Sequence, residues 1–255
     1  MMRIKKMGGK MLLRLSESPV VGPSVRRALE KRWFSKLGST EAVFQSHIEN
    51  NYWSNGETVC GLGSTISNTS NIRSELPKLF RKLNVESILD APCGDFHWFR
   101  KMELPDGFTY LGADIVASLV EANNDQFAND HTSFSHLNII QDALPSADLW
   151  LCRDCLAHLP DKGVFLSLQN FLSSNIRWLL ASNHPFSNKN RDIPTGSFRN
   201  LNLLAPPFSF PDPIESIDDS IPDMAVRQLH LWERSVLEEH LRSNDNFQRA
   251  VQSKA

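Results

Sequence analysis

Two carboxylates flank a tight turn in the segment Ile88–Asp95, which reads Ile-Leu-Asp-Ala-Pro-Cys-Gly-Asp. Asp90 ends a short apolar run, and Asp95 directly follows Gly94. A glycine in such a turn lets the backbone approach a ligand closely, because no Cβ stands in the way. Two carboxylates would repel a pyrophosphate but attract a ligand with positive charges. The segment therefore predicts a binding turn for a cationic ligand.

Asp114 is the second chemical signal, twenty residues after Gly94 and near the end of the apolar run Tyr110–Ile115. A doubly wound fold places an acid at this position to accept hydrogen bonds from ribose hydroxyls. A turn flanked by two acidic residues, followed by an acidic residue placed to bind the ribose, favours S-adenosylmethionine over NAD as the cofactor. An NAD-linked oxidoreductase is the first alternative, and the missing second and third glycines of G-x-G-x-x-G argue against it. A non-catalytic protein that keeps the cofactor pocket as a scaffold is the second.

Asp154 and His158 follow the apolar run Asp148–Arg153 and are four residues apart. On a helical turn they would share a face, so the carboxylate could orient the imidazole as a general base. The alternative is that Asp154 caps the next helix and His158 packs beneath the loop. Cys152 and Cys155 have C-x-x-C spacing, but no second Cys/His pair follows, so no metal site is expected.

Short apolar runs alternate with helical patterns over residues 70–182. This order predicts parallel strands joined by right-handed crossovers, that is, a doubly wound α/β sheet. In one helix Ser74 is the expected cap and Pro77 lies in the first turn. The expected strands are Ser87–Asp90, Tyr110–Ile115, Ser133–Asn138, Asp148–Arg153 and Arg177–Ser182, and the expected later helices are Ala117–Asn124 and Asp161–Leu172.

The last third is rich in proline and asparagine. Residues 183–213 show no helix or strand pattern, and loops of this length are usually functional. Arg191, Arg199 and neighbouring polar side chains predict either recognition of a polar acceptor or a merely solvated loop. Two late strands, Ile214–Asp218 and Arg227–Glu233, would close the sheet with an antiparallel edge.

Gly61–Thr65 reads Gly-Leu-Gly-Ser-Thr. It lacks the lysine and the preceding strand of a phosphate loop. We expect either a turn that folds over the cofactor's carboxylate, with Thr69 and Arg73 nearby, or an ordinary helix-entry loop.

The turn Asp90–Asp95 together with Asp114 resembles motif I and the second-strand acid of class I S-adenosylmethionine-dependent methyltransferases. The resemblance is most specific over 87–160, and the Asp-Ala-Pro-Cys-Gly-Asp turn resembles a less-studied branch of that class. It implies a Rossmann-like, mostly parallel seven-stranded sheet with a reversed last strand. It also implies an adenine contact at Asn138, where the class often has an acid. The cofactor-binding residues expected are Asp90, Pro92, Gly94, Asp95, Asp114, Ile115, Asn138, Ile139 and Arg153.

The N-terminus differs in charge from the rest of the chain. Residues 1–37 carry a net charge of +8, and the whole chain of 255 residues carries −2. We expect a basic leader over 1–45, partly helical or flexible, then a methyltransferase domain over 46–242 and a flexible tail over 243–255. The leader could be solvated, contact a membrane surface or serve as a targeting segment. The lack of interleaved aromatic residues argues against nucleic acid.

The sequence as a whole predicts a cytoplasmic enzyme without a transmembrane segment. It would transfer a methyl group from S-adenosylmethionine to an O or N atom of a small polar acceptor, such as a sugar or metabolite. Alignment of the reactants would supply most of the acceleration, with Asp154 and His158 as the catalytic pair.

Overall fold

The computed structural model describes residues 32–34 and 36–253. Its centre is a seven-stranded sheet of order β3-β2-β1-β4-β5-β7-β6, in which β7 is antiparallel to both β5 and β6 and the other pairs are parallel. This confirms the predicted α/β sheet with a reversed last strand. The strands are β1 (Ser87–Asp90), β2 (Thr109–Asp114), β3 (Thr132–His136), β4 (Leu149–Cys152), β5 (Trp178–Asn183), β6 (Glu215–Asp218) and β7 (Gln228–Glu233).

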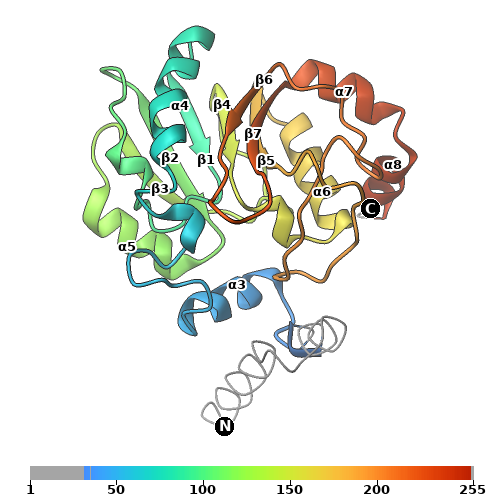
Figure 1. The fold of residues 1–255 in the computed structure, drawn as a ribbon, viewed down its shortest axis with the longest axis horizontal. Helices are drawn as coiled ribbons and strands as arrows, with labels where there is room; N and C mark the ends of the chain where they lie inside the picture. Colours follow the sequence, from blue (N-terminus) through green and yellow to red (C-terminus); the bar gives the residue numbers. More distant parts are fainter. Residues whose placement is uncertain (1–31, 35, 254–255) are drawn as a thin grey trace.

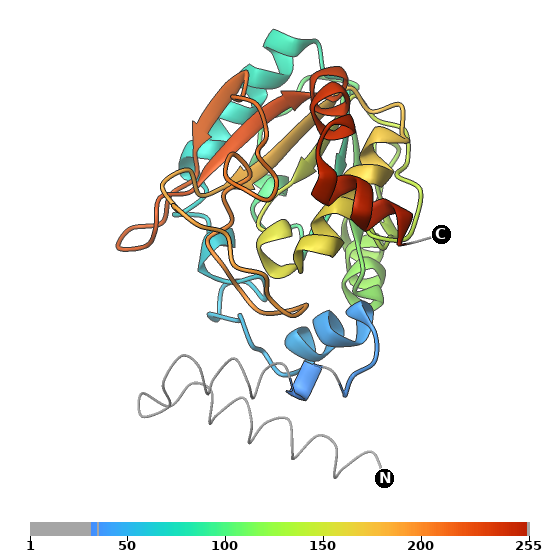
Figure 2. The same ribbon diagram turned by 90° about the vertical axis from the view of Figure 1, so that its right-hand side faces the viewer.

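Helices cover both faces of the sheet (Figures 1 and 2). One face packs against α6, α7 and α8, and the other against α4. Helix α3 lies apart from both layers, below the sheet in Figure 1. The helices are α3 (Thr40–Glu49), α4 (Ser70–Leu83), α5 (Ala117–Phe127), α6 (Asp161–Leu172), α7 (Arg234–Arg242) and α8 (Asp245–Gln252), with short 3-10 turns η1 (Leu62–Ser64), η2 (Phe99–Lys101) and η3 (Leu156–His158).

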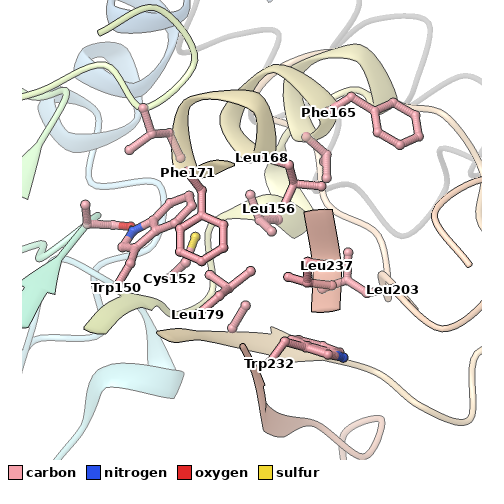
Figure 3. Packing of buried hydrophobic residues seen from close by; sticks show 14 of the residues in the cluster. Trp150, Cys152, Leu156, Phe165, Leu168, Phe171, Leu179, Leu203, Trp232 and Leu237 are labelled. Carbon is pink, nitrogen blue, oxygen red and sulfur yellow. The ribbon is translucent and has the colours of Figure 1, made fainter. Parts of the chain in front are cut away.

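The strands are apolar on both faces because helices cover both. In β4, Trp150 and Cys152 belong to the cluster under α6, whereas Leu149 and Leu151 belong to the cluster under α4. This is the two-residue alternation of a strand. Figure 3 shows Phe171 of α6 over this face, and its ring lies 5.9 Å from that of Trp150. Cys152 is fully buried.

Helix α4 begins earlier than predicted. Thr69, not Ser74, precedes its first residue, so Pro77 lies inside the helix rather than in its first turn. Pro77 is buried on the same face as Leu76 and Phe80, which are fully buried. Packing of this apolar face against the sheet outweighs the hydrogen bond that the proline cannot donate.

Two predicted segment assignments need correction. The expected flexible tail contains α8, whose Phe247 is 4% exposed and packs in the core against Phe165. The expected boundary at residue 46 falls inside α3, which buries Val43 and His47. A few buried side chains are enough to order each segment. Residues 1–31 of the predicted leader lie outside the described residues.

No helix in the described part of the chain is long and apolar enough to cross a membrane. Within that part, residues 184–214 contain no helix or strand, as the sequence predicted. Internal hydrogen bonds hold this long loop together. Asn190 Nδ2 donates to the carbonyls of Asn202 and Pro206, and Asn202 Nδ2 donates to those of Pro185 and Ser187.

Candidate active site

A cavity of about 520 Å³ opens at the carboxyl ends of β1, β2 and β4. This is where ligands bind in open α/β sheets. The cavity brings together seven of the predicted site residues from three strand ends, with α3 and the Gly61–Thr65 loop on its other sides. These seven are Asp90, Pro92, Gly94, Asp95, Asp114, Ile115 and Arg153, and both predicted catalytic residues, Asp154 and His158, line it too.

Gly94 forms the tight turn after β1. Its φ is +58°, a left-handed conformation that favours glycine. A Cβ at this position would come within 2.5 Å of the Cys60 sulfur. The turn therefore needs glycine both for its backbone and for the close approach of the segment that carries Cys60.

Asp90 lies at the end of β1 and is 2% exposed. Tyr110 donates its hydroxyl hydrogen to Asp90 Oδ2 over 2.7 Å. Burial raises the pKa of Asp90 to about 7, although the Tyr110 hydrogen bond and the charge of Arg153 oppose this. A buried carboxylate of this kind gains stability from a cationic ligand, because that ligand would replace the lost hydration.

Asp114 ends β2 and organises the same turn. Its Oδ2 accepts from the Gly94 amide at 3.0 Å, and its Oδ1 accepts from the Val116 amide at 2.9 Å. Each carboxylate oxygen has further acceptor capacity. Burial raises the pKa of Asp114, and these backbone hydrogen bonds oppose the rise. Asp114 can thus hold the turn and still accept a ligand hydroxyl.

Asp95 lines the cavity and also has partners within the protein. Its Oδ2 accepts from the Thr58 hydroxyl at 2.6 Å and from the Val59 amide at 3.1 Å. Asp95 therefore fastens the segment before Gly61 to the turn, and this contact spans too much sequence for local spacing to reveal it.

Asn138 and Ile139 line a small side hollow of about 30 Å³ next to the main cavity. The hollow shares Pro92, Asp114 and Ile115 with the main cavity. Asn138 Oδ1 accepts from the Ile140 amide at 3.0 Å. The two residues thus adjoin the predicted cofactor region, although the side-chain oxygen of Asn138 already accepts one hydrogen bond.

The guanidinium of Arg153 is hydrogen-bonded to other groups of the protein. It donates to both carboxylate oxygens of Asp219, at 2.9 and 2.8 Å, and to the Gly63 carbonyl at 2.5 Å. Arg153 and Asp219 are both almost fully buried. Arg153 therefore ties the Gly61–Thr65 loop to β4 and to the end of β6, and its predicted contact with the cofactor stays a prediction.

Arg227 is a site residue that the sequence did not reveal. At the start of β7, it donates through Nη1 to Asp154 Oδ2 at 2.6 Å and through Nε to the Asp219 carbonyl at 3.1 Å. It is 5% exposed and lines the cavity. Nothing in its local sequence separates this arginine from others, because its partners lie on other elements.

Asp154 and His158 have separate partners. Burial alone would raise the pKa of Asp154, but the charges of Arg227 and His158 outweigh burial and hold that pKa well below its usual value. His158 Nδ1 lies 3.0 Å from the Ser197 carbonyl, so it donates and the neutral ring keeps Nε2 as an acceptor. The predicted orientation of His158 by Asp154 is thus replaced by orientation through a backbone carbonyl.

Two aromatic rings contact His158. Trp53 and Phe198 lie on it with centroids 5.3 and 5.4 Å away. Burial lowers the pKa of His158, and the negative charge of Asp154 opposes this. At neutral pH the imidazole is therefore neutral and can accept a proton.

Gly61–Thr65 lies between the cavity and α4. Gly61, Leu62, Gly63 and Ser64 line the cavity, while η1 leads into α4. Thr69 and Arg73 are directed elsewhere, because their side chains donate to carbonyls of the same segment. The loop itself borders the cavity, and Thr69 and Arg73 stabilise the shape of the loop.

Helix α3 meets the long loop across the cavity. His47 Nε2 lies 3.1 Å from the Gly196 carbonyl, and Gly196 has a φ of +85°. A Cβ on Gly196 would collide with Val43. Glycine at 196 therefore permits the contact that places Phe44 and Ile48 on the cavity wall.

The sequence matches no protein-family model and no curated protein. Solved structures with the same fold do match. One is the N-methyltransferase NodS from Bradyrhizobium japonicum WM9 in complex with S-adenosyl-L-homocysteine, with a TM-score of 0.53 at 14% identity over 75% of this chain and 97% of that chain. Another is the 1,6-didemethyltoxoflavin-N1-methyltransferase of Burkholderia thailandensis with bound S-adenosylhomocysteine, with a TM-score of 0.52 at 12% identity over 85% of this chain and 92% of that chain.

The chain has the class I methyltransferase fold. In this methyltransferase fold the strand order and the antiparallel β7 are those that the motif resemblance implied. The cavity has two parts. We call the part around the ends of β1 and β2, which holds the predicted cofactor residues Asp90 and Asp114, the cofactor half, and the part around β4, β5, β7 and the long loop, which holds the predicted catalytic residues, the acceptor half.

Proposed function

We propose that this chain is an S-adenosylmethionine-dependent methyltransferase acting on an O or N atom of a small molecule. The observation that carries the proposal is the convergence of Asp90, Gly94 and Asp114 on one cavity at the carboxyl edge of the sheet. Buried carboxylates suit a cofactor with an ammonium and a sulfonium group, and a bare glycine turn suits close approach. The residues present therefore fit the cofactor.

When bound, S-adenosylmethionine supplies an electrophilic methyl group on a positively charged sulfur. In the proposal Asp90 faces the cationic part, Asp114 accepts from the ribose hydroxyls, and Ile115 with Ile139 borders the adenine. Alignment of the two reactants in the cavity supplies most of the acceleration. His158 receives the acceptor's proton at Nε2, while the Ser197 carbonyl holds its ring.

Asp154 serves the acceptor half by holding Arg227, since its carboxylate accepts from that guanidinium. This assignment makes Asp154 a positioning residue and His158 the general base. The cytoplasmic location expected from the sequence remains a prediction.

A thermal-shift experiment tests the cofactor assignment. S-adenosylmethionine or S-adenosylhomocysteine at a hundred times its dissociation constant should stabilise the native state by roughly 2.7 kcal/mol. NAD should produce no shift. A shift with NAD and none with either sulfur compound would overturn the proposal in favour of an oxidoreductase.

A non-catalytic scaffold is distinguished by turnover. A scaffold would bind S-adenosylmethionine and never release S-adenosylhomocysteine with any pooled acceptor. An enzyme should form S-adenosylhomocysteine in an acceptor-dependent manner.

A further inference from the structure

One wall of the acceptor half is a row of rings. Trp53, His158, Phe198 and His184 all line the cavity. Neighbouring centroids in this row are 5.3, 5.4 and 6.0 Å apart. Rings at these spacings stack on, or meet edge to face with, a further ring placed beside them.

The rim of the same half is apolar. Leu62, Phe198 and Met224 come from three separate loops, and each lines the cavity while being 57%, 51% and 54% exposed, respectively. Large apolar side chains that gather at a cavity and stay half exposed mark a ligand-binding groove. A ligand that covers them would bury apolar surface from three sides.

The polar side chains of the long loop are occupied elsewhere. Asn190 and Asn202 donate to carbonyls of the loop itself. Arg199 donates to Asp161 and to the Leu159 carbonyl, and neither Arg191 nor Arg199 lines the cavity. Asn200 is the loop residue of this polar group that reaches the cavity. The long loop therefore offers the hydroxyls of a sugar few partners, and unpaired hydroxyls are costly to bury.

Two buried polar atoms belong to residues of the inner wall. Arg227 Nη2 and His184 Nδ1 have no hydrogen-bond partner among the described residues. Both residues are 5% exposed and line the cavity. Buried polar atoms are almost always paired, so a ligand oxygen within reach would satisfy these two. Two ion pairs lie nearby, Arg153 with Asp219 and Arg227 with Asp154, and their charges balance. The ligand oxygen therefore need not carry a charge.

We infer that the acceptor of the proposed methyl transfer is a planar aromatic compound with a hydroxyl or carbonyl oxygen on its inner end. Its rings lie against Trp53 and Phe198, and its oxygen reaches Arg227 and His184. This inference rests on the proposed function and narrows it to one class of substrate. It departs from the polar, sugar-like acceptor that the composition of the long loop predicted.

Calorimetric titration with matched probes tests the inference. The probes are 2-naphthol, its saturated counterpart decahydro-2-naphthol, which has the same skeleton without flat rings, and glucose. 2-Naphthol should bind at least about tenfold more tightly than decahydro-2-naphthol, and glucose should give no heat. Equal or tighter binding of the saturated probe or of glucose would overturn the inference.

Each titration is run with and without S-adenosylhomocysteine, whose own binding is measured first. Failure of S-adenosylhomocysteine to bind counts against the proposed function. Its binding without any preference for 2-naphthol counts against the aromatic acceptor alone. The two failures are therefore distinguishable.

Phe198→Ala, with Phe186→Ala as its control, locates the probe. Both phenylalanines are exposed and lie on the long loop, but Phe186 does not line the cavity. Phe198→Ala should weaken 2-naphthol binding about tenfold, as loss of a stacked ring does. Phe186→Ala should leave binding unchanged. Equal losses in both variants, or no loss in Phe198→Ala, would overturn the placement.

The variant His184→Phe tests the proposed contact between the ligand oxygen and His184, because phenylalanine keeps an aromatic ring and lacks the ring nitrogens. The wild-type protein should prefer 2-naphthol over 2-methylnaphthalene, in which a methyl group replaces the hydroxyl. His184→Phe should reduce that preference about five- to tenfold. An unchanged preference would remove His184 from the polar end.

Discussion

The cofactor half and the acceptor half of the cavity are each stabilised by their own contacts, and these contacts differ in how far apart their residues lie in the sequence. In the cofactor half, Asp114 accepts hydrogen bonds from amides two and twenty residues away. In the acceptor half, the pairs Arg153–Asp219 and Arg227–Asp154 join residues separated by 66 and 73 positions. Contacts between residues that are close in the sequence produce a recognisable sequence motif. Ion pairs and ring contacts between residues that are far apart in the sequence produce no such motif.

The two halves also differ in what they offer a ligand. The cofactor half presents buried carboxylates to a cation. In the acceptor half the charges are already paired, and the remaining surface is aromatic and apolar. Substitutions in one half should therefore leave ligand binding in the other half nearly intact, and the following variants test that independence.

His158→Ala should have the largest effect. Loss of the general base should lower the rate of methyl transfer about 10²–10⁴-fold, measured as S-adenosylhomocysteine formed in a single turnover. Affinity for S-adenosylhomocysteine should not change. Because burial lowers the pKa of His158, the wild-type rate should rise with pH below 6.5 and be level above it. A full rate in His158→Ala would leave alignment as the catalytic device.

Asp154→Asn is the companion variant. We expect a smaller loss of rate than in His158→Ala, together with a higher Michaelis constant for the acceptor, because Asp154 pairs with Arg227 rather than with His158. Equal losses of rate in the two variants would restore the catalytic pair that the spacing predicted.

Asp114→Asn should weaken binding of S-adenosylhomocysteine about 10–100-fold, since a charge-assisted hydrogen bond contributes about 1.5–3 kcal/mol. Asp125→Asn, on the exposed side of α5, is the matched control. Binding of 2-naphthol should be preserved in both variants. Calorimetry that finds unchanged cofactor affinity in Asp114→Asn would remove this residue from the site.

Asp90→Asn should stabilise the protein at alkaline pH. Burial raises the pKa of Asp90 from 3.8 to about 7, so ionisation between these values favours the unfolded chain. The stability contributed by the neutral carboxyl is present below about pH 4 and is lost as the pH rises to about 7. Denaturant midpoints should show Asp90→Asn to be more stable than the wild type at pH 8, by about 1–4 kcal/mol, with a smaller difference at pH 4.5. The opposite order at pH 8 would contradict this account.

Gly196→Ala should lower the free energy of unfolding by about 1–3 kcal/mol, because it strains the backbone and displaces Val43 of α3. Gly56→Ala is the control, since Gly56 has a φ of +87° but open space around its Cβ position. The excess loss in Gly196→Ala measures the contact between α3 and the long loop. Equal losses would mean that the contact contributes nothing.

Deletion of residues 1–31 should have the smallest effect, with cofactor affinity unchanged. Among the described residues, those that line the cavity begin at Phe44. A deletion up to residue 37 would also remove Phe34, which is buried and stacks on His47, so the shorter deletion is the sharper test. Loss of cofactor binding in the shorter deletion would place the basic leader within the site.

The sheet and the cofactor half were predictable because each depends on local pattern. The five strands expected within residues 70–182 and both late strands are present, with ends shifted by at most two residues. Asp90, Gly94 and Asp114 were recognisable from type and spacing, and the structure brings them together. The start of α4 was missed because burial of Pro77 overrides its local cost.

The acceptor half was not predictable in the same way. In the sequence, Arg153 is one of several residues that follow a strand. Its hydrogen bond to Asp219 becomes visible when β4 and the end of β6 are placed together. The polar long loop predicted a polar acceptor, yet its asparagines satisfy the loop's own carbonyls. Trp53, Phe198 and Arg227 carry no motif, because their relation is set by tertiary packing.

A crystal structure of the protein with S-adenosylhomocysteine and 2-naphthol tests the division of the cavity most directly. The account predicts the ribose hydroxyls within hydrogen-bond distance of Asp114, the adenine beside Ile115 and the naphthol rings against Trp53 and Phe198. S-adenosylhomocysteine bound away from Asp90 and Asp114, or occupying the acceptor half, would contradict it.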